Sequence, residues 1–308
     1  MLENLKEKCN VIEMFPQNKR DFSAMIPQSI LPDTEKELAE VIDIEDNMAD
    51  SEGMDAMSEP IFNAVIDYLL EKGKTRDVLM YVLQANFGIR HSDLIKLKLI
   101  NLIDIDGNFR DKVNWCEQKT SKTRQYIIND AVKAATIIYL RNHADKKLTD
   151  FLFTAEGRNK GSKKATYKDE NGKVKALRQN GKFVYEHDEN GNLIPEPLRR
   201  DQAENTLKDA LIAIGVKLKN DRRCKDGEYK LNTHSNRKFY SEKFSEVAYE
   251  LKANGKLNVD ADVLALVQLD LRHSSMQTTM RYNHSFDRIK EIVCQNMNIG
   301  LCVLERYL

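Results

Sequence analysis

The feature that most constrains the fold of this 308-residue chain is a series of apolar residues at helical spacing. Two segments with strand patterns interrupt this series. In EPIFNAVIDYLLEKG, Ile61, Val65 and Leu69 share one helix face, and Pro60 stands where a first helical turn tolerates proline. Similar patterns predict helices beginning near residues 75, 91, 131, 201 and 233, with Ser92 and Thr233 as candidate N-caps. The expected class is α+β and mainly α.

The two interrupting segments favour β-structure. FRDKVNWCEQ and RQYIIND flank the polar turn KTSKT, which predicts a hairpin over 109–129. Residues 155–200 contain Asn-Gly at 171–172, 180–181 and 190–191, and Asn-Gly favours the positive-φ turns of tight hairpins. We therefore expect a small β-finger inserted into a helical scaffold.

Acidic and basic residues are unevenly distributed along the chain, although the formal net charge is zero. Residues 1–60 hold 5 of the 48 basic and 15 of the 48 acidic residues, so the remainder has 43 basic and 33 acidic ones. We interpret 1–56 as an acidic segment or linker and 57–308 as the folded domain. The basic surplus of that domain suits a polyanionic partner such as nucleic acid.

Several classes of protein are disfavoured. No apolar run approaches the roughly 18–20 residues that a membrane span needs, and the charged N-terminus lacks a secretory apolar region. The five cysteines are scattered without a CxxC pair, which disfavours a structural zinc site and a disulfide framework. The expectation is a cytoplasmic protein without a membrane segment, metal or cofactor.

The segment LDLRHSSMQTTMRYNHSFD, residues 269–287, concentrates reactive side chains. It can be a polar helix face, with Tyr282 as an amphipathic core tyrosine, or part of an active site. His273 and His284 can also be read as metal ligands, but they are eleven residues apart without a carboxylate at ligand spacing.

Three other segments can complete such an active site. Arg90 lies at a glycine-terminated helix end and precedes Asp93 by three residues, and His234 precedes Arg237 by three, which places that second pair on one helix face. Alone, the first pair reads as a helix-end ion pair and His234 as a polar core residue. Together, two arginines can clamp a phosphate, a tyrosine can attack it, and a lysine of the KTSKT turn can protonate the leaving oxygen.

In this order, the segments GIRHSDLIKL, KTSKTRQYII, HSNR and LRHSSMQTTMRYNH resemble the active-site boxes of the tyrosine recombinases, the phage-integrase family, over roughly residues 57–290. The resemblance implies a tyrosine-recombinase-like catalytic domain. It also implies a catalytic set made of Arg90, Lys119, His234, Arg237, His273 and Tyr282, supported by Asp93, Lys122 and His284. Lys119 is the expected general acid, and Lys122 is the alternate.

The resemblance further implies a function. Tyr282 would cleave DNA to a 3′-phosphotyrosine and a free 5′-hydroxyl without a metal, and a homo-tetramer on paired double-stranded DNA sites would exchange strands. The C-terminal tail, about 286–308, would dock into a neighbouring subunit or pack on its own domain. Candidate DNA-binding residues in and near the finger and the nucleophile segment are Arg158, Lys160, Lys163, Lys164 and Arg272.

Three departures from the family pattern keep alternatives open. Arg272 stands where the family has glycine, the insertion at 155–200 is long, and only an acidic segment precedes the domain where the family has a helical core-binding domain. The chain is either truncated, a catalytic-only relative, or closes around DNA in another way. A type IB topoisomerase or telomere resolvase with the same chemistry, and a non-cleaving DNA-binding relative, are the alternative functions.

Overall fold

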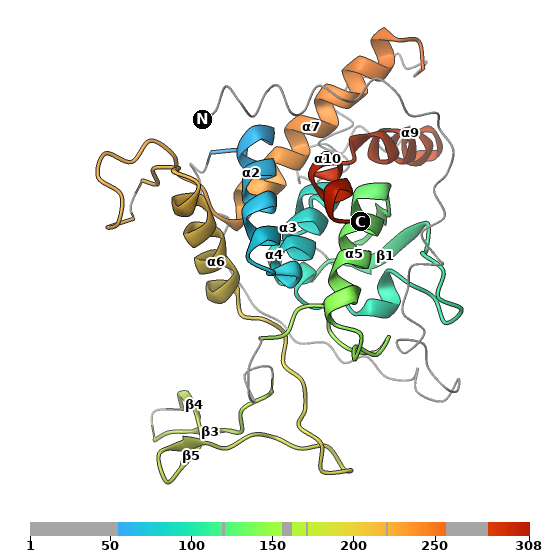
Figure 1. Cartoon of the computed structure of the whole chain (residues 1–308). Coiled ribbons are helices and arrows are strands. Elements are labelled where there is room, and N and C mark those ends of the chain that lie inside the picture. Colours follow the sequence, from blue (N-terminus) through green and yellow to red (C-terminus); the bar gives the residue numbers. More distant parts are fainter. Residues whose placement is uncertain (1–54, 119–120, 156–161, 171, 220, 257–282) are drawn as a thin grey trace.

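The computed structural model describes residues 55–118, 121–155, 162–170, 172–219, 221–256 and 283–308, with the backbone alone for 283–289 (Figure 1). Nearly half of these residues lie in helices, and three two-stranded antiparallel sheets occur among them. The expected α+β, mainly helical class is therefore confirmed. The acidic segment 1–56 lies outside the described residues, apart from its last two.

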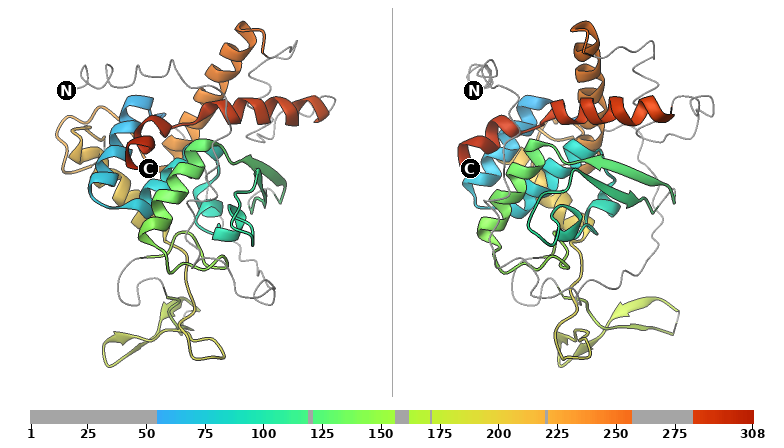
Figure 2. Two further views of the ribbon diagram at one scale, coloured as in Figure 1. Left: turned by 45° about the vertical axis from the view of Figure 1, so that its right-hand side comes forward. Right: turned by 90° about the vertical axis from the view of Figure 1, so that its right-hand side faces the viewer.

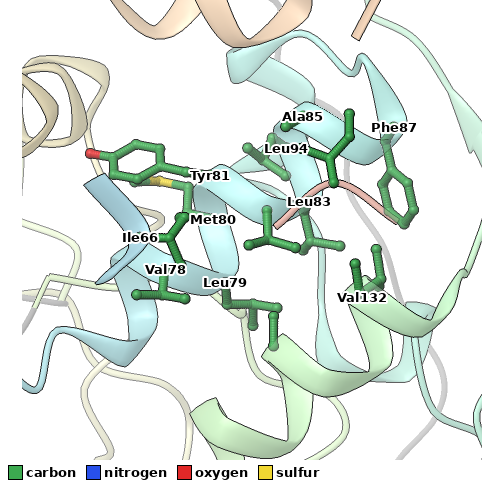
Figure 3. Close-up of a cluster of buried hydrophobic side chains, with 14 of the residues drawn as sticks. Ile66, Val78, Leu79, Met80, Tyr81, Leu83, Ala85, Phe87, Leu94 and Val132 are labelled. Atoms are coloured by element: carbon green, nitrogen blue, oxygen red, sulfur yellow. The ribbon is translucent and has the colours of Figure 1, made fainter. Parts of the chain in front are cut away.

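Helix α3 (Thr75–Phe87) lies at the centre of the helical body. All of its residues except Arg76 are buried, which accounts for a sequence that is apolar on nearly every side. It packs against α2 (Glu59–Glu71), α5 (Asp130–Asn142) and α7 (Thr233–Ala253). Figure 3 shows side chains of α3 in one buried cluster with Ile66, Leu94 and Val132.

The helix boundaries follow local chemistry. Pro60 lies in the first turn of α2, as the sequence predicts, and Val65 and Leu69 are buried. Helix α3 ends at Phe87, and Gly88 follows in the left-handed conformation with φ of 57°. Glycine adopts that conformation without the strain that a Cβ would cause, so the predicted stop at Gly88 is confirmed.

The helix expected from residue 91 is much shorter than predicted. Helix α4 covers only His91–Leu94, with Arg90 rather than Ser92 at the N-cap position. The chain then leaves the helix because residues 98–100 pair with residues 148–151. The N–H of Leu99, the first residue of the 3₁₀ turn η4 (Leu99–Asn101), donates to Asp150 O at 3.1 Å. The expected burial of Leu94, Leu97 and Leu99 is confirmed.

The hairpin predicted over 109–129 is present. Strands β1 (Lys112–Cys116) and β2 (Thr123–Ile127) pair antiparallel, with Val113 opposite Tyr126 and Trp115 opposite Arg124. Because successive side chains of a strand point to opposite faces, Arg124 and Tyr126 both turn inward, and both are buried. A charged side chain thus occupies a core-facing position of β2.

The β-finger is also confirmed within its described residues. Strand β3 (Thr166–Lys168) pairs with β4 (Val174–Ala176), and β5 (Arg178–Gln179) pairs with β6 (Lys182–Phe183). Asn180 and Gly181 have φ values of 50° and 75°, as expected for the Asn-Gly turn between β5 and β6. Figures 1 and 2 show the finger projecting away from the helical body.

Helices α6 (Arg200–Ala213) and α7 follow the finger. The predicted cap of α7 is wrong by one residue: Asn232 caps it, its side chain accepting a bond from His234 N, and Thr233 is the first helical residue. Asparagine is the stronger N-cap of the two because its short side chain reaches the second or third backbone N–H readily. Phe239, Phe244 and Val247 are buried as expected.

The C-terminal tail forms α9 (Asn283–Met297), α10 (Leu301–Leu304) and the 3₁₀ turn η6 (Glu305–Tyr307). Helix α9 packs against α7 and β2, and α10 packs against α2 and α5. Val293, Met297, Val303 and Leu304 are buried in the common core. The tail was expected either to dock into a neighbouring subunit or to pack on its own domain. Its described side chains pack against their own domain.

None of the helices in the described part of the chain is both long and apolar enough to cross a membrane.

Candidate active site

The two arginines predicted to clamp a phosphate, Arg90 and Arg237, lie together in the folded chain. Arg237 Nη1, from α7, donates to the carbonyl oxygen of Gly88 at 2.5 Å, and Arg90 follows Gly88 by two residues. The two guanidiniums are close enough for the charge of Arg90 to act on the pKa of Arg237 and lower it. The first and third of the four segments thus converge.

The centre of this cluster is a carboxylate, Glu117. Its Oε2 accepts from Arg90 Nη1 at 2.6 Å, and its Oε1 lies 3.3 Å from the Tyr126 hydroxyl and 3.8 Å from Arg124 Nη1. The Glu117 side chain is fully buried, whereas the Arg90 side chain is 14% exposed. Three guanidiniums around one carboxylate give the cluster a formal surplus of about two positive charges, so it favours an additional anion.

The end of α3 explains why guanidiniums gather here. The last carbonyl groups of a helix lack partners within the helix and carry partial negative charge. Arg124 Nη2 donates to Phe87 O at 3.1 Å, and its Nη1 donates to Gly88 O at 3.2 Å. The Arg124 guanidinium also lies 4.8 Å from the Tyr126 ring centroid and 5.7 Å from that of Tyr240. These interactions hold a fixed cation beneath the predicted clamp.

The pKa values agree with a charged cluster at neutral pH. Burial, followed by the neighbouring charges of Arg124 and Arg90, lowers the pKa of Arg237 to about 10. Burial acts to raise the pKa of Glu117, but Arg124, Arg90 and Arg237 outweigh it and the pKa falls below its ordinary value. At pH 7 Arg237 and Glu117 are therefore both ionised.

Asp93 joins the first segment to the end of β1. Its Oδ1 accepts from the indole N–H of Trp115 at 3.2 Å and from the backbone N–H of Gln118 at 3.0 Å. Burial raises the pKa of this carboxyl group, and these two hydrogen bonds oppose the shift. Asp93 thus positions the backbone immediately before Lys119. Arg90 bonds Glu117 instead, so the structure does not form the helix-end ion pair that the sequence allowed between Arg90 and Asp93.

His234 meets an arginine that the sequence did not single out. Arg200 Nη2 lies 2.9 Å from His234 Nε2. Because a guanidinium can only donate, Nε2 accepts and the ring proton of a neutral His234 is on Nδ1. Arg200 begins α6, where the helix dipole disfavours a cation. Its place beside His234 therefore extends the basic cluster at some electrostatic cost.

His91 lies under this pair, almost completely enclosed. Burial, followed by the charges of Arg200 and His234, lowers its pKa to about 4. Neither ring nitrogen has a hydrogen-bond partner among the residues that the structure describes. At neutral pH His91 is thus an uncharged packing residue next to Arg90.

Several predicted residues lie outside the described part of the chain. These are Lys119, Arg158, Lys160, Arg272, His273 and Tyr282. His284 lies in α9, whose backbone alone is described at that position. Lys122 is exposed at the start of β2, and its carbonyl oxygen accepts from Glu117 N at 3.1 Å. The nucleophile and the general acid therefore stay predictions.

The two finger lysines that are described lie far along the chain from this cluster, in the finger itself. Lys163 pairs with Glu186 at 2.8 Å, and Lys164 lies 4.2 Å from the ring centroid of Phe183. They stay candidates for DNA binding and form no part of the arginine cluster.

Arg124 and Glu117 in the cluster, and Arg200 beside His234, were not predicted from the sequence. Arg124 carried a usable signal, since it alternates with Tyr126 and Ile128 in a strand whose inward positions are otherwise apolar. A cation at such a position is buried only with partners. Glu117 and Arg200 carried no comparable signal, because the bonds to Arg90 and His234 join residues 27 and 34 positions apart.

The described residues contain no group of three or more His, Cys, Asp or Glu side chains arranged to hold a metal ion. Comparisons of the chain with family models, with curated proteins and with solved structures find no match in any of the three. A function for this chain is therefore inferred from the residues of the cluster and from the order of the four segments.

Proposed function

We propose that this protein is a DNA strand-cleaving and rejoining enzyme of the tyrosine-recombinase type, acting at specific sites through a covalent 3′-phosphotyrosine. One observation carries the proposal: Arg90 and Arg237, chosen from two separate sequence segments as a phosphate clamp, meet around Gly88 O and Glu117. Two unrelated surface arginines would have no reason to meet in a largely buried cluster.

The charge of the cluster supports phosphoryl chemistry. A phosphodiester carries one negative charge, and its pentacoordinate transition state carries more, so preorganised guanidiniums stabilise the transition state most. Arg124 is buried and donates to two carbonyl oxygens, and Arg237 donates to Gly88 O, so both are held in place before any ligand arrives. His234 lies beside Arg200, which places a further cation next to the first residue of the HSNR segment.

In the proposed reaction the hydroxyl of Tyr282 loses its proton to solvent as its oxygen attacks phosphorus, and the bond to the 5′-oxygen of the next nucleotide breaks. The proton for that oxygen comes from Lys119, or from Lys122 if Lys119 is not the acid. The attack of a 5′-hydroxyl on the phosphotyrosine reverses these steps and reseals a strand. The residues invoked for this chemistry require no metal.

Trapping the covalent intermediate tests the proposal. A pool of duplexes with randomised sequence, each nicked so that the short cleaved strand diffuses away, is incubated with the full chain. Protein-bound DNA is then recovered under denaturing conditions. We expect a covalent adduct with wild type, none with Tyr282→Phe, and a loss of about 10²-fold or more with Arg90→Gln.

Two outcomes would count against the proposal. No adduct with any member of the pool would favour a non-cleaving DNA-binding protein. An adduct that persists in Tyr282→Phe would exclude Tyr282 as the nucleophile. Sequence enrichment among the trapped duplexes separates a site-specific recombinase from a topoisomerase, which would cleave most of the pool.

A further inference from the structure

Glu117 has an unusual position for a residue of a phosphate-binding cluster. Its carboxylate is fully buried, and its Oε2 accepts from Nη1 of the partly exposed clamp residue Arg90 at 2.6 Å. Arg124 and Arg237 both act on the same carboxylate. An anion is thus already present where the proposed substrate anion would bind.

We propose that Glu117 is an internal counter-anion of this site, and that in the DNA-free protein its carboxylate takes the place on Arg90 that a phosphate oxygen takes in the complex. The proposal rests on the proposed function, because it assumes that Arg90 and Arg237 bind a phosphate. When an oxyanion binds, Arg90 turns from Glu117 towards it. Glu117 then keeps the deeper cation, Arg124, neutralised.

Electrostatics gives Glu117 two opposing effects. Without it, three guanidiniums would repel one another in a site largely closed to water, so its charge stabilises the empty protein. The same charge repels an incoming phosphate and holds Arg90 back. Removing the charge while keeping the shape should therefore weaken the fold and tighten oxyanion binding.

The exchange also reaches the lysine turn. Glu117 N donates to Lys122 O at 3.1 Å, and Ser121 N donates to Glu117 O at 2.8 Å, so the backbone of Glu117 closes the turn by bonding its far side. Gln118 N is held separately by Asp93 at 3.0 Å. The residue that exchanges its side-chain bond with Arg90 therefore also closes, through its backbone, the turn that carries both candidate general acids.

Sulfate, a tetrahedral oxyanion, is the probe. Thermal unfolding of the full chain is followed against sulfate concentration at constant ionic strength in chloride. The variants are Glu117→Gln and Glu117→Asp, of which the second keeps the charge. Glu246→Gln is the control, because it removes an exposed carboxylate that pairs with Lys243. Glu117→Gln is expected to melt at a lower temperature in chloride and to bind sulfate about tenfold more tightly.

Glu117→Asp and Glu246→Gln should bind sulfate as wild type does, and Arg90→Gln added to Glu117→Gln should abolish the gain. Unchanged or weaker sulfate binding by Glu117→Gln would overturn the proposal. So would a Glu117→Gln protein that fails to fold in both salts, because Glu117 would then act through packing and hydrogen bonding. Recovery of folded protein in sulfate alone would support it.

The same titration separates this inference from the proposed function. If wild type binds sulfate through Arg90 but Glu117→Gln binds it no better, only the counter-anion role fails. If neither protein shows saturable sulfate binding that depends on Arg90, the cluster binds no oxyanion and the proposed phosphate site fails with it.

Discussion

At the residue scale, Gly88 connects the fold to the candidate site. Its left-handed backbone ends α3, and its carbonyl oxygen accepts from both Arg124 and Arg237. The Tyr240 ring lies so close that a Cβ at position 88 would overlap it. The arginine cluster thus depends on a residue that has no side chain.

We predict that Gly88→Ala lowers the free energy of unfolding by about 2–4 kcal/mol, from left-handed strain of about 1 kcal/mol together with overpacking against Tyr240. Gly73→Ala is the matched control, since Gly73 has a φ of 66° but nothing within 4 Å of a new Cβ. The control should cost about 1 kcal/mol. Urea unfolding of both variants measures the difference, and equal losses would show that the approach of Tyr240 is unimportant.

His91 gives the protein a predictable response to acid. Its folded-state pKa of about 4 lies below the value of about 6.5 in an unfolded chain, so the unfolded state binds a proton first as the pH falls. The stability contributed by neutral His91 is complete above pH 6.5 and is lost towards pH 4. Between pH 7.5 and pH 5 the loss is about 2 kcal/mol.

We therefore expect His91→Leu to lose about 2 kcal/mol less stability than wild type between these two pH values. Denaturant unfolding at each pH measures the stability of both proteins. Carboxylates that titrate between these pH values affect wild type and variant alike, so the difference between the two proteins reports His91. His187→Leu, at an exposed position of the finger, should behave as wild type does. A wild-type pH response in His91→Leu would assign the acid sensitivity to other groups.

At the element scale, the features that could be predicted from the sequence are those whose cause lies in residues close together in the chain. The β1–β2 hairpin and the Asn180–Gly181 turn follow from strand alternation and turn chemistry, both of which are local. The early end of α4 was not predictable, because it arises from pairing with residues 148–151. The predicted site contained Arg90 and Arg237 but not Glu117, which only tertiary contacts bring to them.

The finger should contribute to DNA affinity through its charges. Lys168, Lys173 and Lys182 are exposed on the finger. The logarithm of DNA affinity falls linearly with the logarithm of salt concentration, and removing one lysine–phosphate ion pair reduces this slope by about 0.9. Changing all three to Gln is expected to weaken binding to a nonspecific duplex and to reduce the slope by up to about 3. Fluorescence anisotropy at several salt concentrations measures both.

An equal change of charge elsewhere is the control for the finger. Lys217, Lys219 and Lys252 are exposed on the helical body, and their replacement by Gln removes the same charge. If the control weakens DNA binding as much as the finger variant, net charge explains the effect and the finger has no special role.

At the scale of the whole molecule, the C-terminal tail is part of the core. Asn86, fully buried in α3, donates to Ile299 O and accepts from Ile299 N, both at 3.0 Å, while Asn129 donates to Cys294 O at 3.0 Å. These bonds tie the last helices to α3 and α5. A tail that docked into another subunit would have to break them.

Asn86→Leu should therefore destabilise the entire protein by about 3 kcal/mol, because it leaves the backbone groups of Ile299 and the Asn129 amide without the Asn86 side chain as a partner. Unfolding in urea should stay a single transition with a lower midpoint. Asn142→Leu, on the exposed side of α5, should change stability by less than about 0.5 kcal/mol. A separate early transition in Asn86→Leu would indicate that the tail unfolds independently.

The decisive measurement for the proposed chemistry is the identity of the bond in a trapped DNA adduct. The covalent complex is digested with nuclease and protease, and the modified peptide is sequenced by mass spectrometry. We predict a nucleotide joined through its 3′-phosphate to the hydroxyl oxygen of Tyr282. A 5′-linked nucleotide, or attachment to any other residue, would contradict the proposed mechanism.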